Sequence, residues 1–234
     1  MSLVAAQVRA GHRPGLPVLD GVDLEIPGGR TIGLTGPSGV GKTTLARVCA
    51  LLHRPWSGRV CIDGVDVTGR AEASPETRRA VAMLFQSPRQ STSPRLTLER
   101  IITEPLLLSR VPRADRSPLV RDAAARVGLT GDLLSRRPHQ VSDGQLQRAC
   151  LARALVQRPR YLICDEMTAM LDPATTAALV AVLREETRAG LGVLAVSHDH
   201  TLLHAWADSI VELRTRPASR APEAELPKTH IGQI

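Results

Sequence analysis

The chain has 234 residues, of which 43% are hydrophobic and 2% aromatic, so it can bury one sizeable core of mainly aliphatic side chains. It has no apolar run of about 18 residues, and no apolar stretch follows a basic N-terminus, which argues against a membrane-spanning helix and a secretory signal. The net charge of +7 comes almost entirely from arginines spread without a basic block, which is more typical of a GC-rich genome than of a nucleic-acid-binding protein.

In chain order, the first third of the sequence is rich in predicted strands. These lie at residues 2–8, 22–26, 31–35, 57–63 and 81–85. A helix is predicted at 44–52. From residue 87 the composition changes to Ser, Pro and Arg, and the apolar spacing becomes helical at 96–108, 117–127 and 146–156 with no strand-like run. We therefore predict a helical subdomain at approximately residues 87–157, inserted between strands.

The last third of the sequence returns to alternating strands and helices. Strands are predicted at 161–165, 192–197 and 210–213, and an amphipathic helix at 173–189. This alternation indicates a parallel sheet with a nucleotide at the carboxyl ends of its strands. We expect one domain over residues 1–215 and a disordered tail at 216–234, which is rich in Pro, Ala and charge.

Residues 36–44, G-P-S-G-V-G-K-T-T, form a complete phosphate-binding loop between a strand and a helix. Its glycines let successive N–H groups turn inward around phosphate oxygens. Lys42 is expected to reach the β- and γ-phosphates, and the Thr43 hydroxyl to hold Mg²⁺. The candidate cofactor-binding residues are Gly36, Pro37, Ser38, Gly39, Val40, Gly41, Lys42, Thr43 and Thr44. The chain is therefore predicted to bind a nucleoside triphosphate.

Two polar groups follow later strands of the predicted sheet. Asp165 and Glu166 end the strand Y-L-I-C, where an Asp can hold Mg²⁺ and a second carboxylate can orient or deprotonate water. His198 ends the next strand, and a His in the same crevice can bond a γ-phosphate. A helix-capping acidic pair and a structural His are the alternatives to these roles.

A third feature is V-S-D-G-Q at residues 141–145, which opens the helix predicted at 146–156. Ser142 is a plausible N-cap, and its hydroxyl with the Gly144 N–H makes an anion-binding helix start. An ordinary capped helix is the alternative. Because the chain already has one anion site at the phosphate loop, a second site suggests that this helix start binds the nucleotide of another molecule.

Together these motifs resemble the nucleotide-binding subunit of an ATP-binding-cassette transporter over residues 1–215. The matching motifs are the phosphate loop, Gln86, V-S-D-G-Q-L-Q-R (141–148, called the signature motif below), Y-L-I-C-D-E, A-M-L-D at 169–172 and Ser197-His198-Asp199. The resemblance implies the α/β fold of phosphate-loop NTPases, with a RecA-like core, an antiparallel β subdomain and an inserted α-helical subdomain.

The resemblance also implies a mechanism in which two ATPase subunits sandwich two ATP molecules head to tail. Glu166, His198 and Gln86 would be catalytic, and Thr43, Gln86 and Asp165 would organise Mg²⁺. Ser142, Asp143, Gly144 and Gln145 would contact the partner's ATP. The partner would be a different ATPase subunit or a second copy of this chain. The resemblance places the ATPase pair at the cytoplasmic face of a bacterial cell membrane, bound to transmembrane permease subunits.

The stretch F-Q-S-P-R-Q-S-T-S-P-R-L-T-L from Phe85 resembles importers of dipeptides, oligopeptides and nickel or metallophores. Such importers pair two ATPase subunits with two permease subunits and an extracytoplasmic solute-binding protein. Two alternatives stay open: an ATPase for another solute or for export, and a soluble cassette ATPase of DNA repair or translation.

Three positions depart from the family pattern. Asp143 replaces the usual Gly and should repel a triphosphate unless an Arg neutralises it or it points away. No aromatic residue precedes Trp56 to stack on adenine, which leaves His12 as the nearest candidate. The third departure is the motif D-E-M-T-A-M-L-D at residues 165–172, which differs from the family pattern but keeps the acidic residues of that pattern.

Overall fold

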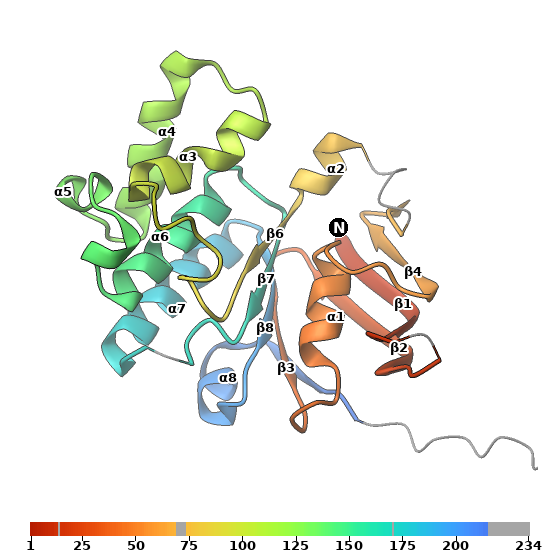
Figure 1. Cartoon of the computed structure of the whole chain (residues 1–234). Coiled ribbons are helices and arrows are strands. Elements are labelled where there is room, and N and C mark those ends of the chain that lie inside the picture. Colours follow the sequence, from red (N-terminus) through yellow and green to blue (C-terminus); the bar gives the residue numbers. More distant parts are fainter. Residues whose placement is uncertain (14, 69–73, 170, 215–234) are drawn as a thin grey trace, which may run out of the picture.

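The structure, a computed structural model, describes residues 1–13, 15–68, 74–169 and 171–214. Two β-sheets lie on either side of helix α1, and the remaining larger helices pack on the opposite side of the second sheet (Figure 1). This arrangement confirms the predicted α/β class with an antiparallel and a parallel sheet. The predicted disordered tail at 216–234 lies outside the described residues.

The first sheet is antiparallel, with strand order β2-β1-β4-β5. Its strands are β1 (Ser2–Ala10), β2 (Leu19–Pro27), β4 (Ser57–Ile62) and β5 (Val65–Asp66). Strand β1 continues two residues past its predicted end because a bulge at Gln7, with φ of 49°, shifts the register. The bulge lets Ala5 and Val8 both point to the core despite their odd spacing.

The second sheet is parallel, with strand order β6-β7-β8-β3-β9. Its strands are β6 (Val81–Leu84), β7 (Tyr161–Asp165), β8 (Gly192–Val196), β3 (Thr31–Thr35) and β9 (Ser209–Glu212). Every residue of β3, β7 and β8 is buried, as expected for a parallel sheet covered on both faces. Because all five strands run the same way, their carboxyl ends meet at one edge.

Helix α1 (Lys42–Cys49) follows β3 and lies between the two sheets, where its apolar side helps to form one of two hydrophobic clusters. The other cluster lies on the far face of the parallel sheet. It is covered by α3 (Leu98–Leu108), α4 (Arg113–Arg126), α5 (Gly131–Leu134), α6 (Asp143–Leu155), α7 (Pro173–Arg188) and α8 (His200–Trp206). The short helix α2 (Pro75–Arg79), the 3-10 turn Pro138–Gln140, the short strand β5 and helices α5 and α8 were not predicted from the sequence.

The four cysteines are free thiols, and Cys49, Cys150 and Cys164 are buried while Cys61 is partly exposed. Burial raises the pKa of Cys49 to about 12 and also raises the pKa of Cys150 and Cys164. These three thiols therefore act as small apolar core residues.

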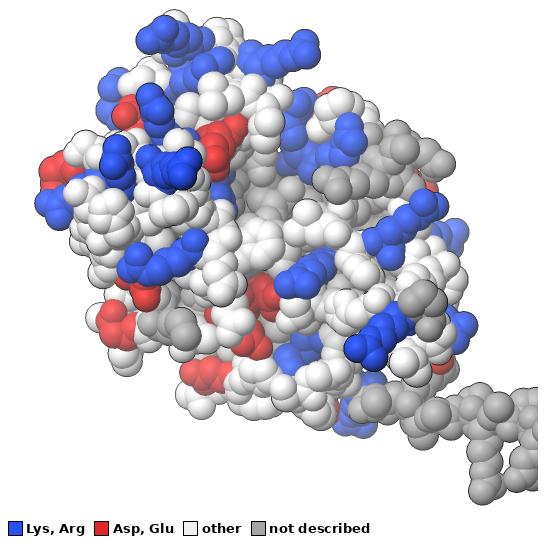
Figure 2. Space-filling model, viewed as in Figure 1, with Lys and Arg blue, Asp and Glu red and all other residues white. Residues whose placement is uncertain are grey.

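Arginine and lysine side chains are scattered over the face seen in Figure 2 and gather over the end of the molecule formed by α3 and α4. Uncharged surface separates these groups. Within the part of the chain that the structure describes, we find no helix that is both long and apolar enough to span a membrane.

Candidate nucleotide-binding and catalytic site

The parallel sheet brings four predicted motifs to one edge. The phosphate loop follows β3, Gln86 follows β6, Asp165 ends β7, and His198 follows β8. These strands are neighbours in the order β6-β7-β8-β3, so residues more than 100 positions apart in sequence meet around one hollow. The edge is therefore the candidate site.

The phosphate loop has the open geometry that its glycines predict. Gly36, Gly39 and Gly41 have φ values of 143°, 78° and 109°. Helix α1 has no side-chain cap and no acidic residue in its first turn, so its N-terminus is free to attract an anion. The adjoining hollow has a volume of about 330 Å³. It is lined by His12, Val18, Ser38, Gly39, Gly41, Lys42, Thr43, Thr44, Glu166 and His198.

Lys42 is almost completely buried and points back along its own loop. Its Nζ donates hydrogen bonds to the carbonyl oxygens of Gly36 at 2.8 Å and Pro37 at 3.0 Å. The ammonium group therefore lies inside the curve of the loop, where a bound phosphate oxygen would meet it.

Asp165 is 6% exposed, and the Thr43 hydroxyl donates to its Oδ1 at 3.2 Å. Burial raises the pKa of Asp165, and the neighbouring negative charge of Glu166 adds to that rise. A buried carboxylate beside a hydroxyl is a donor set that fits Mg²⁺, which typically takes one or two carboxylates and completes its shell with phosphate oxygens and water. Thr43 and Asp165 would hold the ion. Gln86 lines a hollow together with them and donates to Glu166, and its part in the Mg²⁺ site stays a prediction.

Glu166 lies at the centre of a three-residue cluster. Gln86 Nε2 donates to its Oε2 at 3.0 Å, and His198 Nε2 lies 2.8 Å from its Oε1. The Glu166 side chain is 19% exposed, and its backbone has φ of 49°, a conformation that a non-glycine residue adopts only at some cost. The fold thus holds this carboxylate in a fixed orientation at the rim of the hollow.

The signature motif lies at the start of α6, and none of its residues lines the phosphate-loop hollow. Ser142 is the N-cap, as predicted: its hydroxyl accepts from the Gln145 N–H at 3.2 Å, and Gln145 Oε1 accepts from the Ser142 N–H at 3.0 Å. Asp143 and Gly144 occupy the first turn. This second helix start is therefore separate from the first within one chain.

Arg89 is the residue that the sequence analysis missed. Its Nε lies 2.7 Å from Asp143 Oδ1, so an arginine neutralises the carboxylate that replaces the family's usual glycine. The sequence had left open whether an arginine neutralises Asp143 or whether Asp143 points away. The only signal in the sequence was the position of Arg89, three residues after Gln86.

His12 lines the hollow as its proposed role requires, but its ring is engaged by other groups. Its Nε2 lies 3.3 Å from Thr44 Oγ1, and its ring meets that of His53 edge to face, with centroids 5.8 Å apart. The stacking of His12 on adenine stays a prediction.

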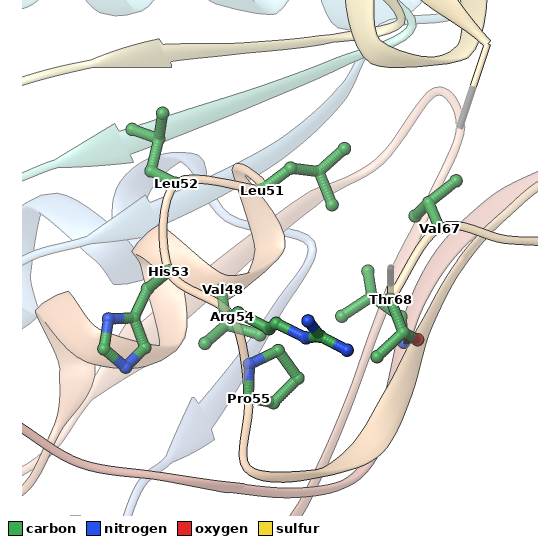
Figure 3. Close-up of a pocket in the computed structure, with 9 residues that line it drawn as sticks. Val48, Leu51, Leu52, His53, Arg54, Pro55, Val67 and Thr68 are labelled. Atoms are coloured by element: carbon green, nitrogen blue, oxygen red, sulfur yellow. Dashed lines mark hydrogen bonds between the residues drawn. The ribbon is translucent and has the colours of Figure 1, made fainter. Parts of the chain in front are cut away.

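A second hollow, of about 280 Å³, lies at the C-terminal end of α1 (Figure 3). Its walls include Val48, Leu51 and Leu52, and the Arg54 side chain extends across it toward Thr68. The residues that line it include His53 but no carboxylate, so this hollow lacks the carboxylates found at the edge of the parallel sheet.

Residues 19–169 match the sequence family described as ABC transporter. The methionine import ATP-binding protein MetN 1 of Rhodococcus jostii is 36% identical over 221 residues, which cover 92% of this chain and 64% of that protein. The oligopeptide transport ATP-binding protein OppF of Salmonella typhimurium is 36% identical over 200 residues, which cover 84% and 60%. The chain thus spans about three-fifths of the length of these relatives.

Among solved structures, the dimeric ATP-binding cassette MJ0796 in a post-hydrolysis state with ADP and Pi is similar to this chain with a TM-score of 0.80. The two are 25% identical, and the match covers 91% of this chain and 94% of the other. Another structure, described as the ATP-binding subunit of an ABC transporter, has a TM-score of 0.79, also at 25% identity, and covers 91% and 86%.

Proposed function

Because the chain belongs to the ABC transporter family, we propose that it is the ATP-binding and ATP-hydrolysing subunit of a membrane importer. The observation that carries this proposal is the fixed carboxylate of Glu166, held between Gln86 and His198 at the rim of the phosphate-loop hollow. A carboxylate in that place can orient a water molecule toward the γ-phosphate.

The other residues of the edge would act on the triphosphate itself. Lys42 and the loop N–H groups would bind the phosphate oxygens. Mg²⁺, held by Thr43 and Asp165, would neutralise charge on the phosphates. His198, whose side chain is half exposed, would contact the γ-phosphate and register its loss. These groups come from the start of α1 and from the carboxyl ends of β7 and β8, so binding and hydrolysis would share one framework.

The position of the signature motif supports the proposal of a dimer. None of Ser142, Asp143, Gly144 and Gln145 lines this chain's own hollow, so they would complete an ATP site on a partner ATPase subunit. The relative MJ0796 is described as dimeric. The partner would be a different ATPase subunit or a second copy of this chain.

The permease would contact the segment that follows Gln86. An open hollow of about 490 Å³ lies there and connects the Gln86 segment to the metal-binding side of the site. It is lined by Thr43, Arg47, Phe85, Gln86, Ser87, Gln90, Ser91 and Asp165. A permease helix seated in it would lie near the catalytic groups at the cytoplasmic face of the membrane.

The names of the relatives point to peptides or an amino acid as the solute. A nickel or metallophore solute, which the sequence resemblance also allowed, has no support among these names. In either case selection of the solute would fall to the permease and an extracytoplasmic binding protein, because the hollow of this chain is built for phosphates.

The test is ATP hydrolysis by the purified chain, alone and with its partner ATPase, and by the variant Glu166→Gln. We expect the variant to lose at least about 100-fold in kcat and to bind ATP within about 3-fold of the wild type. Glu185→Gln, on the exposed face of α7, is the matched control and should retain full activity. A wild-type chain that binds no ATP, or a Glu166→Gln variant with normal turnover, would contradict the proposal.

Affinity purification from detergent-solubilised cells separates the transport proposal from the soluble alternatives. Recovery of a permease supports transport. Recovery of nucleic acid without a permease would instead favour a soluble ATPase of repair or translation.

A further inference from the structure

Arg89 joins two segments that are about 50 residues apart in the sequence. Its Nη1 donates to the carbonyl oxygen of Pro138 at 2.9 Å, and its Nη2 donates to that of Val141 at 3.3 Å. Its Nε lies 2.7 Å from Asp143 Oδ1. One planar guanidinium therefore contacts Pro138, Val141 and Asp143, three residues of the segment that leads into α6.

The contact with Arg89 matters for anion binding because Asp143 carries a negative charge at the start of α6. An aspartate in the first turn stabilises a helix, but its negative charge opposes the attraction of the helix N-terminus for an anion. Both side chains of the pair are nearly half exposed, although the Asp143 Oδ1 that faces Arg89 is itself buried and accepts no hydrogen bond of good geometry. Such a partly exposed ion pair contributes about 1 kcal/mol or less to stability. The effect of Arg89 should therefore appear in the binding of an anion at this helix start more than in folding.

The junction around the pair also includes the segment after Glu166. A small cavity of about 90 Å³ lies between Arg89, Asp143 and Gln147, with Met167 on its wall. Gln147 is 1% exposed, and its Nε2 donates to the Met167 carbonyl oxygen at 3.1 Å and to that of Phe85 at 3.4 Å. Helix α6 is thus linked at one place to the segments that carry Gln86 and Glu166.

We propose that Arg89 is a positioning residue for the signature motif and that its charge sets the ATP affinity of the site that α6 completes on the partner subunit. This inference rests on the proposed function. With Arg89 in place, Asp143 presents a neutral pair to the partner's triphosphate. Without Arg89, the same carboxylate would repel the triphosphate.

The experiment measures the KM for ATP and the kcat of the assembled ATPase pair with variants of this chain. Arg89→Met removes the charge, so we expect KM to rise about five-fold while kcat changes less than two-fold, and the rise should shrink at high salt. The double variant Arg89→Met with Asp143→Gly should return KM to within about two-fold of the wild type. Arg121→Met, an exposed arginine on α4, is the control for the same change in net charge.

Two further variants separate charge from positioning and guard against misfolding. Arg89→Lys keeps a positive charge but lacks the planar fork, so we expect a nearly normal KM together with faster amide hydrogen exchange at residues 138–143. Asp143→Gly alone leaves Arg89 unopposed, and KM should fall about three-fold.

The outcomes distinguish the two proposals. A wild-type pair that neither binds nor hydrolyses ATP overturns the proposed function and this inference with it. Normal wild-type hydrolysis together with an unchanged KM in both Arg89→Met and Asp143→Gly overturns this inference alone.

Discussion

The starts of α1 and α6 are two candidate anion sites of opposite construction. At α1 the N-cap is Gly41, which has φ of 109° and no side chain to satisfy the helix N–H groups, and no acidic residue follows. At α6 the N-cap Ser142 and Gln145 bond to each other's N–H groups, and Asp143 adds a negative charge. The N–H groups at the start of α1 have no side-chain partner and can bind an anion, whereas at the start of α6 side chains of the helix itself already accept from such groups.

This difference indicates which of the two helix starts can bind phosphate without a partner subunit. The α1 start has free N–H groups and the ammonium of Lys42 beside them, so it should bind a triphosphate in the isolated chain. The α6 start depends on Arg89 to offset Asp143, so it should contribute only when a partner presents its ATP.

The largest expected effect is on ATP binding by the isolated chain. Lys42→Met removes a charge-assisted contact to the phosphates, and we expect affinity to fall on the order of 100-fold. Ser142→Ala, the matched change at α6, should leave this affinity within about two-fold of the wild type. Isothermal titration with ATP and Mg²⁺ measures both, and an equal loss in the two variants would remove the contrast.

Replacement of a glycine by alanine should cost more stability in the phosphate loop, at Gly36, than at the start of α6, at Gly144. A Cβ on Gly36 would lie 2.4 Å from the backbone oxygen of Leu213 at φ of 143°, so Gly36→Ala should lose about 2–3 kcal/mol of unfolding free energy. A Cβ on Gly144 would instead meet the side chain of Thr175 at 2.8 Å, which can move. Gly144→Ala should cost less than about 1 kcal/mol. Urea unfolding measures both, and equal losses would show that α6 is as rigid as the loop.

Asp165→Asn tests the cost of the buried charge on the α1 side. Without nucleotide, this variant should be more stable by about 1 kcal/mol at neutral pH, because the folded state buries the charge of the wild-type carboxylate. Because folding raises the pKa of Asp165, the wild type regains stability as the pH falls below the folded pKa. The difference between the two proteins should shrink across that range and be smallest near the ordinary aspartate pKa of 3.8.

Thermal unfolding as a function of pH measures the Asp165 effect. Added ATP with Mg²⁺ should then stabilise the wild type more than Asp165→Asn, since the variant loses a metal ligand. A pH-independent difference between the two proteins would contradict the role of charge burial.

The smallest effect is expected at the cap of α6. Ser142→Ala removes the acceptor for the Gln145 N–H, and helix caps of this kind contribute about 1 kcal/mol or less in exposed positions. Amide hydrogen exchange in the first turn of α6 should quicken, while α1 should be unchanged. Unaltered exchange at α6 would mean that Arg89 alone holds this helix start.

Much of the fold followed from local patterns in the sequence. The apolar runs that became β3, β7 and β8 are short and fully buried, and such runs are characteristic of parallel strands. The bulge at Gln7 and the short helices α2, α5 and α8 could not be predicted, because a few residues carry too weak a periodic signal. Within the predicted subdomain at 87–157, the first helix begins only at Leu98.

The sequence by itself determined the order of motifs and, through the parallel sheet, the edge at which Lys42, Asp165 and His198 would meet. Only the tertiary structure decided that Gln86 bonds to Glu166 and that Arg89 neutralises Asp143. The physical reason is the distance along the sequence between the residues that interact. A strand or a phosphate loop is encoded by neighbouring residues, whereas a contact between side chains 54 to 80 positions apart depends on how the whole chain packs.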